Sequence, residues 1–251
     1  MKITVLGSSH GNPTQEAFQT SVLLEEKGKF YLLDAGDGAA TLLIRQKVDP
    51  SALSALFITH FHLDHTASLP LLLHLGQKHR SLYPQILPEI FLPEYGKKEL
   101  LQGICELNHV AMPLKVRFRD MRKEFFEDGN LSVHFIPTCH IAPDPESGSC
   151  SFAVWVQTEG SRVLFTGDLK GDFSDFPMEA ASRSDVLFCE LTHFDPEKAL
   201  ETFRKLPLKK LIFYHLHDPY QTPEGRKKIL QLCQNFPFEV VTGFDNLTLT
   251  L

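Results

Sequence analysis

Four side chains that bind metal ions well lie within six residues of one another: His60, His62, Asp64 and His65. They follow the apolar run Ala55–Thr59, which predicts a buried strand. In an extended chain residues i and i+2 point the same way, so His60 and His62 could bind one ion together. Asp64 and His65 come where the chain turns, and they point elsewhere. Imidazole with carboxylate favours zinc, manganese or iron over calcium. The alternative is a surface cluster of hydrogen-bonded histidines.

A binuclear site needs partners from elsewhere in the chain. We searched for His or Asp at the end of a predicted strand, beside a small or turn-forming residue, and three positions qualify: His140, Asp168 and His215. His140 would complete a histidine set with His60 and His62. Asp168 could bridge two ions with its two oxygens, and His215 would join the second ion. A lone histidine at a strand end is more often structural, so the prediction depends on the whole set.

Periodicity predicts an α/β chain. Strands are expected over 3–6, 20–25, 29–33, 55–59, 89–92, 131–136, 151–157, 162–166, 186–189, 211–214, 238–241 and 247–251, and helices over 38–47, 69–75, 97–107, 197–206 and 223–235. Two halves, each with strands and then helices, predict two packed sheets with helices outside. We expect one domain over 1–251. Residues 76–130 are broken by prolines and are expected to form a variable, pocket-shaping region.

The bulk composition narrows the class of function. The 251 residues carry a formal net charge of −6, which argues against a protein that binds long nucleic acid by bulk charge. A small phosphorylated substrate held by metals stays compatible with that charge. The five cysteines form no CxxC pair, as is typical of the reducing cytoplasm. Without a signal-peptide core or a run of eighteen apolar residues, we expect a cytoplasmic location and no membrane contact.

Read together, these motifs resemble the metallo-β-lactamase-fold hydrolase superfamily over nearly the whole chain. The resemblance rests on Thr59–His65, His140, Thr166–Asp168, His215 and the turn Asp34–Gly36. It implies a four-layer αββα sandwich with two divalent ions, zinc or else manganese or iron, at one edge between the sheets. A histidine at position 62, where some redox relatives carry glutamate, favours hydrolysis. Asp168 in place of cysteine, with Asp64 present, disfavours a β-lactamase.

Two segments resemble the ribonuclease Z-like and cyclic-phosphodiesterase-like branch: the loop Gly7–Pro13 and the segment Leu187–Phe194. In ribonuclease Z a histidine upstream of the last metal histidine pairs with a glutamate, which here implies Glu190 and His193 as an acid/orienter pair. The alternative is a structural carboxylate and a surface histidine. The candidate catalytic residues are Asp64, Glu190 and His193. A long Gly/Pro-rich arm is absent, and Leu216–Tyr220 lacks the arginine of that branch, which argues against transfer-RNA processing.

The predicted function is therefore a phosphodiesterase with two metal ions that acts on a small or nucleotide-like substrate. A homodimer is compatible with this prediction. The alternatives are thioester or lactone hydrolysis, a transfer-RNA 3′-processing endonuclease, and a non-catalytic metal-bound binding module. The roles of three polar residues are left open by the sequence. His10 could contact substrate or be solvated, and His217 and Asp218 could orient ligands or form an exposed turn.

Overall fold

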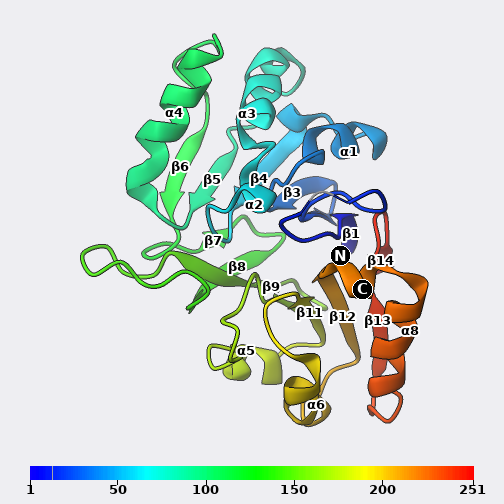
Figure 1. The fold of residues 1–251 in the computed structure, drawn as a ribbon. Helices are drawn as coiled ribbons and strands as arrows, with labels where there is room; N and C mark the ends of the chain where they lie inside the picture. The colour runs from blue at the N-terminus through cyan, green and yellow to red at the C-terminus, as the bar shows by residue number, and fades with distance from the viewer. Residues whose placement is uncertain (13) are drawn as a thin grey trace.

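The computed structural model describes residues 1–12 and 14–251, so Pro13, the last residue of the predicted early loop, lies outside the described residues. Two seven-stranded sheets face each other (Figure 1). In the first the order is β14 (Thr248–Thr250), β1 (Lys2–Gly7), β2 (Ser21–Glu26), β3 (Lys29–Leu33), β4 (Leu53–Phe57), β5 (Glu89–Leu92) and β6 (Arg117–Asp120). In the second it is β13 (Glu239–Thr242), β12 (Lys210–Leu216), β11 (Val186–Leu191), β10 (Arg162–Phe165), β9 (Ser151–Gln157), β8 (Ser132–Thr138) and β7 (Phe126–Glu127).

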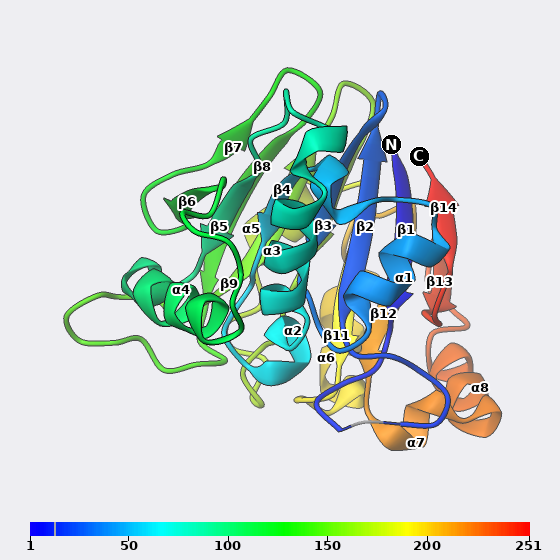
Figure 2. The same cartoon turned by 90° about the horizontal axis from the view of Figure 1, so that it is seen from above.

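Helices cover the outer face of each sheet (Figure 1). Those on the first sheet are α1 (Ala39–Arg45), α3 (Leu69–Lys78) and α4 (Lys98–Leu107), and those on the second are α5 (Met178–Ser182), α6 (Pro196–Arg204) and α8 (Pro223–Leu232). Two single-turn helices, α2 (Leu63–Thr66) and α7 (Asp218–Gln221), lie at the same end of the sandwich (Figure 2). This is the predicted αββα arrangement. In the described residues no helix has the length and apolarity needed to span a membrane.

The core between the sheets is built by alternating strand residues. Val5, Phe57, Val154 and Phe188 are fully buried there and belong to one apolar cluster with contributions from both sheets. Their neighbours along the strands face the helices, as the period of two requires. The sheets therefore need both faces covered, which explains why so many strands are continuous apolar runs. The single-domain organisation and the homodimer stay predictions.

The direction of the strands gathers the site residues at one edge. β10, β11 and β12 run parallel to one another, and β8 is antiparallel to β9, which is antiparallel to β10. All four strands therefore end at the same edge of the second sheet. In the first sheet β3 and β4 are parallel and end together. Since polar residues follow several of these strands, the two sheets present them to each other across that edge.

The predicted elements are found with shifted ends, and five strands and α-helices were missed. β4 ends at Phe57, two residues before the predicted end. β12 continues through His215 to Leu216, so the prediction that this histidine follows the strand is wrong. The missed elements β6, β7, α2, α5 and α7 are short, and the first two lie in the region 76–130. Edge strands of two to four residues carry too few alternations to show a period.

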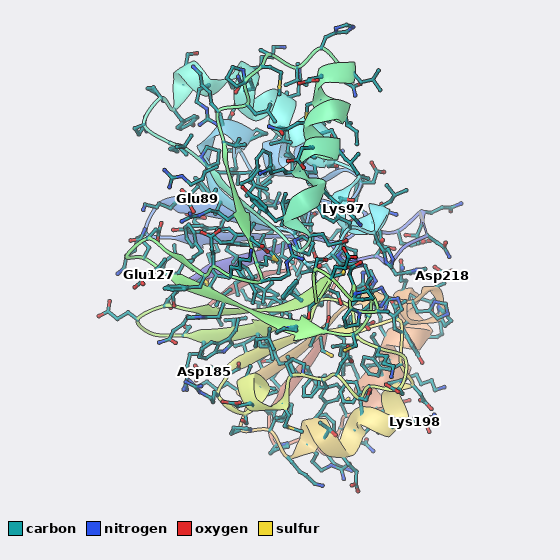
Figure 3. All side chains as sticks on the ribbon, turned by 90° about the vertical axis from the view of Figure 1, so that its left-hand side faces the viewer. Glu89, Lys97, Glu127, Asp185, Lys198 and Asp218 are labelled. Atoms are coloured by element: carbon teal, nitrogen blue, oxygen red, sulfur yellow. The ribbon has the colours of Figure 1, made fainter. Side chains whose placement is uncertain are left out.

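The sheets are tied together at the end away from the candidate site. The buried Tyr31 hydroxyl donates to Asp128 at 2.8 Å, and the Lys29 ammonium contacts the same carboxylate oxygen at 2.8 Å. Figure 3 shows neighbouring Glu127 and Glu89 at this end, opposite Asp218 and Lys97. Burial raises the pKa of the Asp128 carboxyl, but the hydrogen bonds from Lys29 and Tyr31 outweigh it, and the net pKa is lowered.

We expect Asp128→Ala to lower the free energy of unfolding by about 1–3 kcal/mol at pH 7, because it leaves the Tyr31 hydroxyl buried without its acceptor. A lowered folded-state pKa means that the carboxylate stabilises the protein above the unfolded pKa and that this stabilisation is lost as the pH falls. The difference between wild type and variant in urea unfolding should therefore shrink towards acid pH. Asp128→Asn, which keeps an acceptor for Tyr31, is the milder control. A pH-independent difference would contradict the explanation.

Candidate active site

Two ligand clusters share one carboxylate at the edge between the sheets. The first brings together His60, His62, His140 and Asp168, and the second Asp64, His65, Asp168 and His215. Within each cluster one ligand atom per residue lies within 4.8 Å of every other. The structure therefore gathers all seven predicted metal ligands and divides them as predicted.

The spacing of the ligand atoms suits metal ions. Nε2 of His60 and of His140 each lie 3.6 Å from Asp168 Oδ2, and His215 Nε2 lies 3.4 Å from the same oxygen. On the other oxygen, Asp168 Oδ1 is 3.4 Å from His65 Nε2. Atoms bound about 2.0–2.2 Å from one ion at tetrahedral angles are separated by about 3.3–3.6 Å. Asp168 Oδ2 thus faces imidazoles of both clusters, and Oδ1 faces an imidazole of the second.

Buried atoms without partners mark the same place. Among the described residues, His60 Nε2, His65 Nε2 and Asp168 Oδ1 are buried and have no hydrogen-bond partner. Buried polar atoms are normally satisfied, because an unmade hydrogen bond costs about 1–3 kcal/mol. Three of the six buried side-chain atoms without a partner in the described residues thus belong to the clusters, and the other three are on Ser21, Arg80 and Gln221. The donor set therefore fits divalent ions of the zinc, manganese or iron type.

Local backbone geometry directs these side chains. His215 has a φ of 50° and lies where the pairing of β11 with β12 shifts by one residue, between Glu190 and Leu191. A bulge of this kind turns one side chain away from the strand's alternation, so His215 reaches the site from inside a strand. On the other side of the site, the backbone around Asp64 packs directly against Gly36. Only glycine fits there, since a Cβ would lie 2.3 Å from the Asp64 carbonyl oxygen.

Hydrogen bonds behind the clusters fix which ring nitrogen faces the site. His65 Nδ1 donates to Asp34 Oδ2 at 2.8 Å. Thr59 Oγ1 donates to Asp34 Oδ2 at 2.9 Å, so its lone pairs can accept from His60 Nδ1 at 3.1 Å. Thr20 Oγ1 donates to the Ser9 carbonyl and can accept from His215 Nδ1 at 2.6 Å. In each case a hydrogen bond holds Nδ1, and Nε2 faces the cluster.

The protonation of the ligands follows from their burial and charge. Burial lowers the pKa of His60 well below its ordinary value, and it is also the main cause that lowers the pKa of His215 to about 4. Both are neutral, which is the metal-binding form. Burial also lowers the pKa of His65, but Asp168 and Asp34 outweigh it and hold that pKa well above its ordinary value. Burial raises the pKa of Asp168, while His215, His65 and His60 bring it well below its ordinary range. Asp168 is therefore a carboxylate, which is the form that binds a cation.

Glu190 and His193 form a pair beside the first cluster. His193 Nδ1 donates to Glu190 Oε1 at 3.0 Å, while the buried carboxylate also accepts from the backbone N–H groups of Leu169, Thr192 and His193. The His193 ring centre lies 4.4 Å from that of His140. Burial lowers the pKa of His193, but the hydrogen bond to Glu190 and the nearby carboxylates raise it to about 8. The predicted pair is thus in contact and faces the clusters.

Sequence reasoning missed two residues behind the ligands. Asp34 was interpreted only as part of a glycine turn, although it follows the strand Lys29–Leu33 and meets the same strand-end rule as the metal ligands. Its φ of 57° and full burial place its carboxylate between Thr59 and His65. Thr20 carries no such signal, since it is an ordinary threonine just before β2.

We expect Thr20→Val to weaken divalent-ion binding at the second cluster about 10–100-fold, the usual effect of removing a residue that orients a ligand. Valine keeps the volume but leaves His215 Nδ1 without its acceptor. Competition with a fluorescent zinc chelator measures the change. Thr20→Ser keeps the hydroxyl and should bind as wild type does, whereas equal affinities for all three proteins would rule the role out.

Comparisons with known proteins agree with this geometry. The chain is 24% identical to ribonuclease Z of Pyrococcus horikoshii over 287 aligned residues, covering 93% of this chain and 92% of that one. Ribonuclease Z of Bacillus licheniformis is 25% identical, covering 98% and 97%.

Solved structures share the fold at low identity. The metallo-β-lactamase fold protein YhfI from Bacillus subtilis superposes with a TM-score of 0.76 at 16% identity, covering 99% of this chain and 98% of that one. The short form of human tRNase Z gives 0.72 at 22%, covering 100% and 99%. A diphosphatase of the PhnP family gives 0.72 at 17%, covering 100% and 97%. The predicted metallo-β-lactamase fold is therefore confirmed. The family model described as "Anti-Pycsar protein Apyc1" matches residues 1–236, and the chain belongs to that family.

Proposed function

We propose that this protein is a metal-dependent phosphodiesterase that opens the phosphodiester ring of a cyclic nucleotide. The observation that carries the proposal is the shared carboxylate Asp168, which joins two complete ligand clusters with a Glu190–His193 pair beside them. Membership of the Apyc1 family, which is associated with degradation of cyclic nucleotides, supports a small phosphodiester as substrate. The likeness to a PhnP-family diphosphatase is compatible with phosphorus chemistry on the same fold.

Seven residues of the two clusters would hold the metal ions. His60, His62 and His140 would hold one ion, Asp64, His65 and His215 the other, and Asp168 would contact both. When bound, such ions lower the pKa of a water molecule and neutralise charge on phosphoryl oxygens. Water adds to phosphorus while the bond to the ribose oxygen breaks.

Proton transfer to that leaving oxygen is assigned to His193. Glu190 holds Nδ1, and no hydrogen bond occupies Nε2 in the described residues, so Nε2 is the free donor. Glu190 itself is enclosed by three backbone N–H groups and acts as a positioning residue. A proton given to the ribose alkoxide makes it a better leaving group.

The proposal is tested by offering zinc- or manganese-loaded protein a panel of substrates side by side. The panel contains the four common 3′,5′-cyclic nucleoside monophosphates, bis(p-nitrophenyl) phosphate and a glutathione thioester. We expect turnover of at least one cyclic nucleotide to the linear monophosphate, and turnover of the aryl phosphodiester. Hydrolysis of the thioester alone would replace this proposal by the thioesterase alternative.

A further inference from the structure

A third group of potential metal ligands lies beside the two clusters and shares no residue with them. It contains His10 from the loop after β1, and His217 and Asp218 from the turn after β12. Their ligand atoms all lie within 4.8 Å of one another. His10 Nε2 is 2.7 Å from Asp218 Oδ1, and the rings of His10 and His217 are 5.4 Å apart between centres. Residues more than 200 positions apart thus converge on one point.

Hydrogen bonds connect the two loops that carry these residues. The Leu216 backbone N–H donates to the Ser8 carbonyl at 3.0 Å. The buried Gln221 amide donates to Ser9 Oγ at 2.9 Å and to the Leu216 carbonyl at 2.8 Å. These contacts lie directly before His10 and on both sides of His217 and Asp218 along the chain. The three ligands are therefore held in place by the fold, which is what a binding site requires and a chance meeting of surface side chains lacks.

One ligand is buried and two are open to solvent. His10 is 4% exposed, whereas Asp218 is exposed and lies at the site end of the molecule with Lys97 (Figure 3). An ion bound by these three residues would have its remaining coordination positions open to water. Two imidazoles and one carboxylate suit zinc and similar transition-metal ions, and suit magnesium or calcium poorly.

The hydrogen bonding of His10 allows an ion to enter. Its Nε2–H donates to Asp218, so the bond between them is held by a single proton. An ion would take the place of that proton, which would move to Nδ1. Among residues 1–12 and 14–251, Nδ1 has one hydrogen-bond contact to give up, a 3.4 Å approach of the Asn12 backbone N–H. His10 Nε2 and Asp218 Oδ1 would then both turn a lone pair towards the ion, in exchange for the hydrogen bond between them and the Asn12 contact.

We propose that His10, His217 and Asp218 form a third divalent transition-metal site at the rim of the binuclear centre. It adjoins the second cluster: His217 follows His215 by two residues, and a Cβ on Gly11 would lie 3.6 Å from Asp64 Oδ2. An ion there would link the early loop to the turn after β12. The site exchanges with solvent through its two exposed ligands and does not depend on the reaction proposed above.

Metal counting tests the site without reference to activity. The full-length protein is stripped with a chelator, dialysed against micromolar Zn²⁺ and analysed by inductively coupled plasma mass spectrometry. We expect wild type to retain one ion per chain more than His217→Ala or Asp218→Asn. Both substitutions are at exposed positions, so the fold should persist, as thermal melts would show. His134→Ala, which removes an exposed histidine outside all three groups, should bind as wild type does. Equal metal content in all four proteins would overturn the proposal.

A fourth variant separates this site from the binuclear centre. Asp168→Asn removes the carboxylate shared by the two clusters and leaves His10, His217 and Asp218 unchanged. We expect it to keep one ion per chain, and that ion to be lost when His217→Ala is added. An ion that survives the double substitution would show that the third site lies elsewhere. Failure of cyclic-nucleotide hydrolysis would leave these counts unaffected, so the two proposals fail independently.

Discussion

Replacing His193 by alanine is expected to slow hydrolysis of the cyclic nucleotide about 10²–10⁴-fold, the usual contribution of a positioned proton donor. The donor matters because the ribose oxygen leaves as a strongly basic alkoxide. Nδ1 of His193 is occupied by Glu190, so a single nitrogen serves the substrate. His193 is in neither ligand cluster, and the metal content of the variant should equal that of wild type.

The leaving group supplies the control for this prediction. p-Nitrophenolate is a stable anion near neutral pH and needs no proton to depart. His193→Ala should therefore hydrolyse bis(p-nitrophenyl) phosphate at nearly the wild-type rate while losing activity on the cyclic nucleotide. Steady-state kcat on both substrates measures the difference between the two losses of activity. His134→Ala is the matched histidine control. An equal loss on both substrates would assign His193 to binding or structure, and no loss on either would remove it from the site.

Much of the fold could be predicted because it depends on periods within short segments. The apolar run before His60 and the runs before His140 and Asp168 are each long enough to identify a strand. Parallel strands end at one edge, so a polar residue after each of them meets the others there. That rule found His140 and Asp168, and it also selected His215, which the structure places inside β12. The other four ligands were found as a dense group at 60–65. Applied evenly, the strand-end rule would also have found Asp34.

The remainder depends on contacts between distant segments. Nothing around Thr20 indicates that its hydroxyl lies 2.6 Å from His215, because 195 residues separate them. The bulge at His215 is equally hidden, since its apolar neighbours continue as an ordinary strand. The meeting of His10 with Asp218 joins two loops that have no period. Hydrogen bonds of this kind are determined by how the sheets close on each other, which local propensity does not encode.

Asp168→Asn should have the widest effect of any single substitution, because one carboxylate belongs to both clusters. Its two oxygens lie 3.4–3.6 Å from four imidazole nitrogens, those of His60, His140, His65 and His215. Asparagine keeps the size of the side chain but removes the negative charge and turns one acceptor into a donor. It would therefore point an N–H group into a place suited to a cation. We expect both ions of the binuclear centre to be lost.

Activity should fall on the order of 10³-fold or more, since the ions supply several kcal/mol of transition-state stabilisation and each 1.4 kcal/mol is tenfold in rate. Unlike His193→Ala, this variant should lose the aryl and cyclic substrates together, because both need the phosphoryl oxygens neutralised. The single-cluster variant His62→Ala is the comparison, as it removes one exposed ligand and leaves the second cluster complete. If Asp168→Asn retained both ions, or His62→Ala released both, the two clusters would not be joined through Asp168 in the way that the geometry indicates.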